Sequence, residues 1–164
     1  MTWDAYHRRA AAVREIANAA DRQRATADPD HLLETVPQAA EAFSSVDELL
    51  REVQMRWLRT LGGQLDRLGA EGPVGDAESV VVRAWTETAR IHPGLRVVLD
   101  RAEGHPALAT ARATETRLLA AAAGLPASEG ERLRAAGQDA TVLPEPDDDE
   151  PRGLIARLRE ALAA

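Results

Sequence analysis

The chain has 164 residues, of which 45% are hydrophobic, 3% are aromatic and none is cysteine, and its formal net charge is −7 at pH 7. This length is sufficient for one domain with a hydrophobic core, while the lack of cysteine excludes disulfides, thiolate metal sites and thiol nucleophiles. The acidic balance also opposes general affinity for nucleic acid or anionic lipid.

The domain organisation follows from where the composition changes. Residues 1–143 are rich in alanine and leucine at helical spacing, which predicts an all-α fold, a single bundle of about six to eight helices. Residues 144–151 form an acidic, proline-rich linker, and residues 152–164 form an amphipathic C-terminal helix. No apolar run resembles a signal peptide or a membrane span, so we expect a cytoplasmic location and no membrane partner.

The first part of the chain predicts one long helix and two short ones. Apolar positions recur at steps of three and four from Trp3 to about Arg24, which describes one stripe of a helix. Between Asp28 and Phe43 the prolines divide the chain into two short helices, because proline suits the first helical position and ends the helix before it.

The next segment predicts the central helix of the bundle. Ser45 and Glu48 have the spacing of a capping box, and the apolar stripe that follows continues for about six turns. Gly62 and Gly63 interrupt this helix at a cost of about 1 kcal/mol each. Close backbone contact or a kink would explain them better than a role in chemistry.

Three further helices are predicted after the turn EGPVGD. Asp76 can cap a helix that reaches His92. The segment 106–123 forms a strong helix that Gly124 ends, with inward positions at Leu108, Ala111, Leu118, Leu119 and Ala122. Ser128 and Glu131 form a second capping box for a short helix near 127–136.

The residues that carry chemistry are few and scattered. The histidines at positions 7, 31, 92 and 105 match no metal-binding motif, so we interpret them as surface or capping residues. Glu115 lies near the apolar stripe of its helix, where a carboxylate can pair with an arginine, and catalysis would need a second group beside it. A metal-dependent enzyme that uses these histidines and acids is therefore the less favoured alternative.

Motifs for phosphate binding and for activated serine nucleophiles are absent from the sequence. We therefore predict that the protein is not an enzyme, with no catalytic, cofactor-binding or metal-binding residues and no cofactor. The tryptophans at positions 3, 57 and 85 fall on predicted inner faces. They are expected in the core, and Trp57 with Trp85 would be the walls of a ligand pocket if one exists between the helices.

Two stretches of the sequence resemble a known family. AFSSVDELLREVQMRWLRTL resembles the point in TetR-type transcriptional regulators where an aromatic residue closes the recognition helix and a long connecting helix begins. AWTETARIHPGLRVVLD, continuing into HPALATA, resembles the regulatory helices of the same family. The resemblance covers roughly residues 8–123, and it implies an all-helical fold, dimerisation and an apolar ligand cavity.

The chain departs from that family in the DNA-binding region. The stretch from Leu32 to Phe43 is too short for a complete helix-turn-helix and contains no glycine for its turn. Residues 28–50 hold six acids and no arginine. If the resemblance holds, the helix-turn-helix region of this chain is truncated and acidic. Such a surface repels phosphates, so we predict no sequence-specific DNA binding.

These observations favour a non-enzymatic helical module that acts in regulation or protein interaction. Its partner is an unidentified protein, and a homodimer is one candidate because thin alanine-rich faces gain from packing against a second copy. The alternative is a ligand-sensing TetR-like helical protein, with or without residual DNA binding.

The C-terminal helix offers the candidate partner-binding residues. Its apolar face carries Leu154, Ile155, Leu158 and Leu162. A helix of this length is marginal alone in water, so another surface must cover these side chains if it is to be ordered. Docking onto the protein's own bundle is the favoured interpretation, because a short tether gives a high effective concentration. Docking into a groove on another protein is the alternative.

Overall fold

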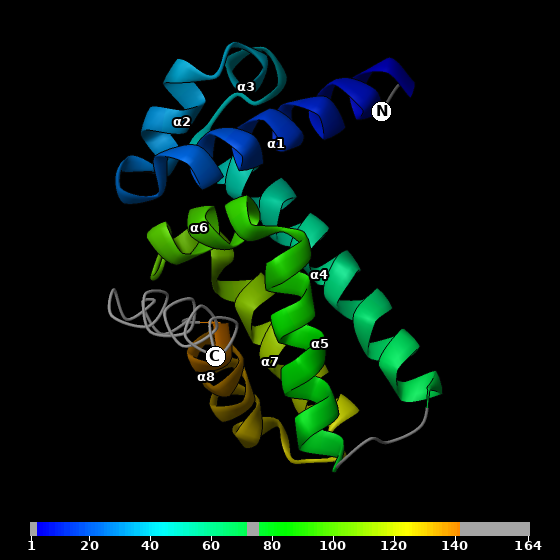
Figure 1. Cartoon of the computed structure of the whole chain (residues 1–164). Coiled ribbons are helices and arrows are strands. Elements are labelled where there is room, and N and C mark those ends of the chain that lie inside the picture. Colours follow the sequence, from blue (N-terminus) through cyan, green and yellow to red (C-terminus); the bar gives the residue numbers. More distant parts are fainter. Residues whose placement is uncertain (1–2, 72–75, 142–164) are drawn as a thin grey trace, which may run out of the picture.

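The computed structural model describes residues 3–71 and 76–141, and all the regular secondary structure within them is helical (Figure 1). Eight α-helices and three short 3₁₀ turns follow one another without a strand in this part of the chain. The predicted all-α bundle is therefore confirmed. The acidic linker and the C-terminal helix, with Leu154, Ile155, Leu158 and Leu162, lie outside the described residues.

The predicted helices occur in the expected order, and one further helix, residues 93–101, follows the helix that ends near His92. Their bounds are α1 Trp3–Gln23, α2 Pro29–Thr35, α3 Pro37–Ala42, α4 Val46–Ala70, α5 Ala77–Ile91, α6 Pro93–Arg101, α7 Ala109–Ala122 and α8 Gly130–Thr141. The 3₁₀ turns are η1 Arg24–Thr26, η2 Pro106–Leu108 and η3 Ala127–Glu129.

The helices form two groups that share α4 and α6. In Figure 1, α1, α2 and α3 lie together at one end of the molecule, and α5, α7 and α8 form the other group. The long helix α4 runs from the first group along the second, while α6 packs against α1 on one side and α4 on the other. None of the helices in the described part of the chain is long and apolar enough to cross a membrane.

Local signals account for the short helices α2 and α3. The Asp28 carboxylate accepts hydrogen bonds from the backbone amides of Asp30 and His31, at 3.0 and 3.4 Å, and so caps α2. Val36 alone separates the two helices, because Pro37 begins α3 at its first position. The prediction of two short helices between Asp28 and Phe43 is confirmed.

The start of α4 differs in one detail from the predicted capping box. The Ser45 hydroxyl accepts a hydrogen bond from the Glu48 amide at 3.2 Å, as expected. The Glu48 carboxylate, however, accepts from the amide and hydroxyl of Ser44, at 2.9 and 2.8 Å, and from Arg9 of α1. Glu48 therefore caps α4 and fastens α1 to it.

The hydrogen bonds to Glu48 change its acidity. The backbone and hydroxyl bonds from Ser44, followed by the bond from Arg9, lower the pKa of this carboxyl from 4.5 to about 2. A carboxyl whose pKa is lower in the folded state stabilises the fold above its unfolded pKa, and this stabilisation is lost as the pH falls toward the folded pKa.

Glycine, as well as alanine, lets the helices approach closely. A β-carbon on Gly94 of α6 would lie 1.8 Å from the carbonyl oxygen of Ala17 in α1, and one on Gly130 would lie 2.1 Å from the carbonyl oxygen of Thr116. In contrast, Gly62 and Gly63 have no atom within 4 Å of such a position, and α4 continues through both. Close backbone contact therefore does not explain the glycine pair in α4.

Three sequence predictions about individual residues are wrong. Trp3 is 75% exposed, because the beginning of α1 extends past the helices that cover the rest of its stripe. Ala122 is exposed, and Glu115 and Ala120 are buried on α7 instead. In the described residues Ser128 caps no helix; it lies in η3, and α8 continues to Thr141.

We predict that Gly94→Ala destabilises the protein by about 2–3 kcal/mol, because the methyl group would displace the α1 backbone. Gly62→Ala is the matched control, and it should stabilise α4 by about 0.5–1 kcal/mol because alanine favours a helix more than glycine does. Urea unfolding measures both values. A Gly94→Ala protein at least as stable as the wild type would contradict the close crossing of α1 and α6.

We also predict a pH-dependent effect of Glu48→Gln. At pH 7 the variant should be about 1–2 kcal/mol less stable than the wild type, as expected for losing a charged cap. The difference should shrink between pH 4.5 and 3, because the wild-type carboxylate then begins to lose its stabilising effect. Urea unfolding at several pH values measures this, and a difference that stayed constant from pH 7 to 3 would contradict it.

Candidate functional site

A buried carboxylate lies at the centre of the second helix group. Glu115 projects from α7 and is 2% exposed. Its Oε1 atom accepts hydrogen bonds from the indole nitrogens of Trp57 and Trp85, each at 3.0 Å, and its Oε2 atom accepts one from the Gln54 side-chain amide at 2.9 Å. The hydrogen-bond partners are thus uncharged donors, where the sequence had indicated an arginine.

The local structure explains how these donors converge. Gln54 and Trp57 are three residues apart on α4, so they share one face of that helix. Trp85 comes from α5, and its ring meets that of Trp57 edge-on, with centroids 5.2 Å apart and planes inclined at 69°. Both tryptophans are completely buried, which confirms their predicted place in the core.

Arg96 of α6 covers the tryptophan pair. Its guanidinium carbon lies 5.0 Å from the Trp57 ring centroid and 5.4 Å from the Trp85 ring centroid, within the range of cation–π attraction. Two of its nitrogens also contact one oxygen of Asp100, at 2.9 and 2.8 Å. We call Gln54, Trp57, Trp85, Arg96 and Glu115 the Glu115 cluster.

The Glu115 cluster is closed by packing. The α8 backbone at Gly137 touches the Trp85 ring so closely that a β-carbon there would lie 2.7 Å from a ring atom. Surface cavities of about 280, 520 and 490 Å³ are lined by other described residues, and neither tryptophan lines any of these three. Of the cluster, only Arg96 reaches one, the 520 Å³ cavity.

This arrangement suits a structural carboxylate. Burying a carboxylate without partners is costly, and here each oxygen receives at least one hydrogen bond from a fixed donor. Proton transfer to a substrate would require an approach to these oxygens, which are enclosed by side chains of α4 and α5. Glu115 therefore holds α7 in place against α4 and α5 through these hydrogen bonds.

The histidines do not gather into a metal site, although His105 Nε2 lies 3.8 Å from a carboxylate oxygen of Asp47. Among residues 3–71 and 76–141, no group of three or more histidine or carboxylate side chains could hold a metal ion. The His105 ring accepts a hydrogen bond from the Ala107 amide at 3.3 Å, which confirms a capping role. His92 lies 3.1 Å from the Thr60 hydroxyl, and burial, followed by the charge of Arg56, lowers its pKa.

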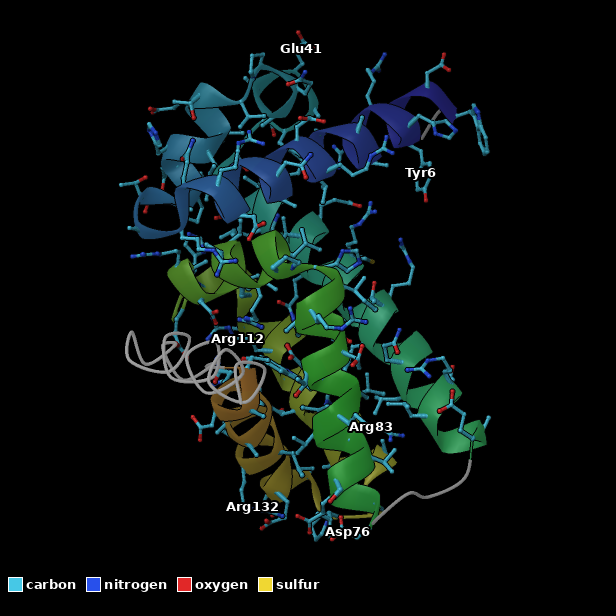
Figure 2. The ribbon with its side chains drawn as sticks, in the orientation of Figure 1. Tyr6, Glu41, Asp76, Arg83, Arg112 and Arg132 are labelled. Carbon is cyan, nitrogen blue, oxygen red and sulfur yellow. The ribbon has the colours of Figure 1, made fainter. Side chains whose placement is uncertain are left out.

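A different kind of candidate site lies at the beginning of α1. Trp3 and Tyr6 are 75% and 47% exposed, and both rings contact His7, with centroid distances of 4.4 and 5.6 Å. We call Trp3, Tyr6 and His7 the aromatic patch. Figure 2 shows Tyr6 on the part of α1 that extends beyond the rest of the bundle.

Sequence reasoning missed both the aromatic patch and the role of Gln54 and Arg96. The patch was missed because its residues continue the apolar stripe of α1, which gave no sign that the neighbouring helices end earlier. The sequence did contain a signal for Gln54, because it is a polar residue on the inward face of α4, one turn before Trp57. Arg96 had no distinguishing signal among the twenty arginines.

We predict that Glu115→Leu lowers the free energy of unfolding by about 3–5 kcal/mol, because two indole groups and one amide would remain buried without an acceptor. Glu115→Gln is the conservative control; its carbonyl oxygen can still accept from both tryptophans, so it should cost less. Urea unfolding followed by far-ultraviolet circular dichroism measures both. Equal losses in the two variants, or a Glu115→Leu loss below about 1 kcal/mol, would contradict this role.

No protein-family model, no curated protein and no solved structure matches the chain.

Proposed function

We propose that the protein is a non-enzymatic helical module that binds another protein through its aromatic patch. The main support is the difference in exposure among the tryptophans. Trp57 and Trp85 are fully buried, whereas Trp3 is 75% exposed beside Tyr6. Large aromatic side chains supply much of the binding energy at protein interfaces, and an exposed cluster of them is unusual on a surface without a partner.

The charges beside the aromatic patch suggest the chemistry of its partner. Arg8 lies next to the patch and Arg14 lies two turns after His7 on the same side of α1. Neither arginine forms an ion pair within the part of the chain that the structure describes. A complementary partner would therefore offer an apolar surface to the rings and carboxylates at its edge.

A second copy of the chain is one candidate for this partner. The sequence carries 27 acids against 20 arginines, so a second molecule has carboxylates to offer to Arg8 and Arg14. A symmetric pair of α1 helices would also place the two aromatic patches together, as two-fold dimers commonly do. Homodimerisation is thus one form of the same proposal, and an unrelated acidic protein is the other.

The alternative function is ligand sensing by a TetR-like helical protein. The observation that favours it is Arg96, which lines the 520 Å³ cavity and also lies over both buried tryptophan rings. A ligand in that cavity would contact Arg96 and change the emission of Trp57 and Trp85. A saturable fluorescence change with one member of a metabolite panel, retained in Trp3→Phe, would favour sensing over protein binding.

We predict that a photoreactive phenylalanine analogue at Tyr6 cross-links to the partner in cells of the source organism, because Tyr6 would lie within the interface. The same analogue at Arg117, which is exposed on α7, is the control. A dimer would appear as an adduct of twice 17.7 kDa, also with the purified protein. Adducts of equal yield at both positions, or none at Tyr6, would contradict the proposal.

Purified protein provides a second measurement of the same proposal. If the partner is a second copy, sedimentation equilibrium should show association that Trp3→Ala combined with Tyr6→Ala weakens by at least tenfold. Met55→Ala is the matched control, because Met55 is an exposed apolar side chain of α4 outside the patch. Equal weakening by Met55→Ala would argue against the aromatic patch as the interface.

A further inference from the structure

The 520 Å³ cavity lies where the described chain ends. It is bounded by the end of α5, by α6 and by the end of α8. The apolar part of its wall consists of Ala89, Pro93, Val97 and Ala140. Thr141, the last described residue, also lines the cavity, so the described part of the chain ends at the cavity edge.

Basic side chains surround this apolar wall. Arg24, Arg90 and Arg96 line the cavity. Arg24 pairs with Asp21 at 2.7 Å and Arg90 with Glu87 at 2.8 Å, and both arginines are mostly exposed. Exposed ion pairs of this kind contribute little stability, so these two guanidinium groups can also bind other carboxylates.

Only one acid, Asp100, belongs to the lining residues. Its carboxylate is already held by Arg96, at 2.8 and 2.9 Å, and it accepts a further contact from Gln138 at 3.3 Å. The described lining residues therefore combine an apolar wall with three arginines and one acid, while Asp21 and Glu87 pair with two of these arginines from outside the lining. The complement of this lining is a segment that carries both carboxylates and aliphatic side chains.

Residues 142–164 contain both kinds of side chain, most of the acids before Pro151 and most of the leucines after it, together with Arg152, Arg157 and Arg159. The acids Glu145, Asp147, Asp148, Asp149 and Glu150 follow Thr141 closely, and Leu154, Ile155, Leu158 and Leu162 come after them. At about 3.4 Å per extended residue, Glu145 can reach ~14 Å from Thr141 and Glu150 can reach ~30 Å. Both the charges and the leucines of this segment therefore lie within reach of the cavity.

We propose that the C-terminal segment, residues 142–164, binds in the 520 Å³ cavity of its own chain. Its acids contact Arg24 and Arg90, and its leucines cover the wall formed by Pro93 and Val97. Because the segment is attached at the cavity edge, its effective concentration is on the order of millimolar. Any other ligand of this cavity must displace it, so the segment acts as a built-in competitor.

Introduced cysteine pairs test this proposal in the full-length protein, because the natural chain has no cysteine that could interfere. Val97→Cys with Leu158→Cys should form an intramolecular disulfide under mild oxidation at least tenfold faster than the control pair Met55→Cys with Leu158→Cys. Met55 is exposed on α4 and does not line the cavity. Peptide mass spectrometry identifies the bridge, and far-ultraviolet circular dichroism shows that each variant is folded.

Thr86→Cys with Leu158→Cys is a second cavity pair, which keeps the test decisive if Val97→Cys does not fold. Converting the five acids from Glu145 to Glu150 to amides should slow bridging of the cavity pair several-fold and leave the control pair unchanged. Cavity pairs that react no faster than the control would overturn the proposal. Bridges that form only between two chains, detected by mixing labelled and unlabelled protein, would also overturn it and assign the segment to a second copy.

Discussion

The three hydrogen bonds to Glu115 hold α4, α5 and α7 in one arrangement. A carboxylate in a protein interior is tolerated only when donors hold it, and these donors come from two other helices, α4 and α5. A rotation of α7 or a shift of α5 by one residue would leave at least one of the groups unpaired. Arg96 extends the constraint to α6, because its place over both rings requires the two tryptophans to be adjacent.

Most of the secondary structure was predictable because its causes are local. Asp28 and Pro29 determine the start of α2, and Asp76 caps α5 through a 2.7 Å hydrogen bond to the Ser79 amide. Signals of this kind act within one turn and can be read directly from the sequence. The ends of α7 and α8 were less well predicted, since two 3₁₀ turns adjoin these helices where the sequence suggested continuous helix or a cap.

The candidate sites were less predictable because they depend on distant parts of the chain. Glu115 is separated from Gln54 by 61 positions and from Trp85 by 30. Helical periodicity identifies an inward face but does not say which other inward face it meets. The same limit explains Trp3, whose exposure depends on where the neighbouring helices end rather than on the pattern of α1. Trp57 and Trp85, suggested as pocket walls, pack instead against each other, Arg96 and Gly137, and line none of the three cavities described.

The inclined packing of Trp57 and Trp85 has an optical consequence. The two indole rings lie with their centroids 5.2 Å apart and their planes inclined at 69°. Their electronic transitions couple, so the near-ultraviolet circular dichroism of the pair depends on this fixed geometry. The helices themselves begin and end through local caps, so they can persist when the long-range contacts loosen. A compact state of this kind retains far-ultraviolet ellipticity and loses the near-ultraviolet bands. The tryptophan pair therefore distinguishes a molecule with a uniquely packed interior from one that is merely helical.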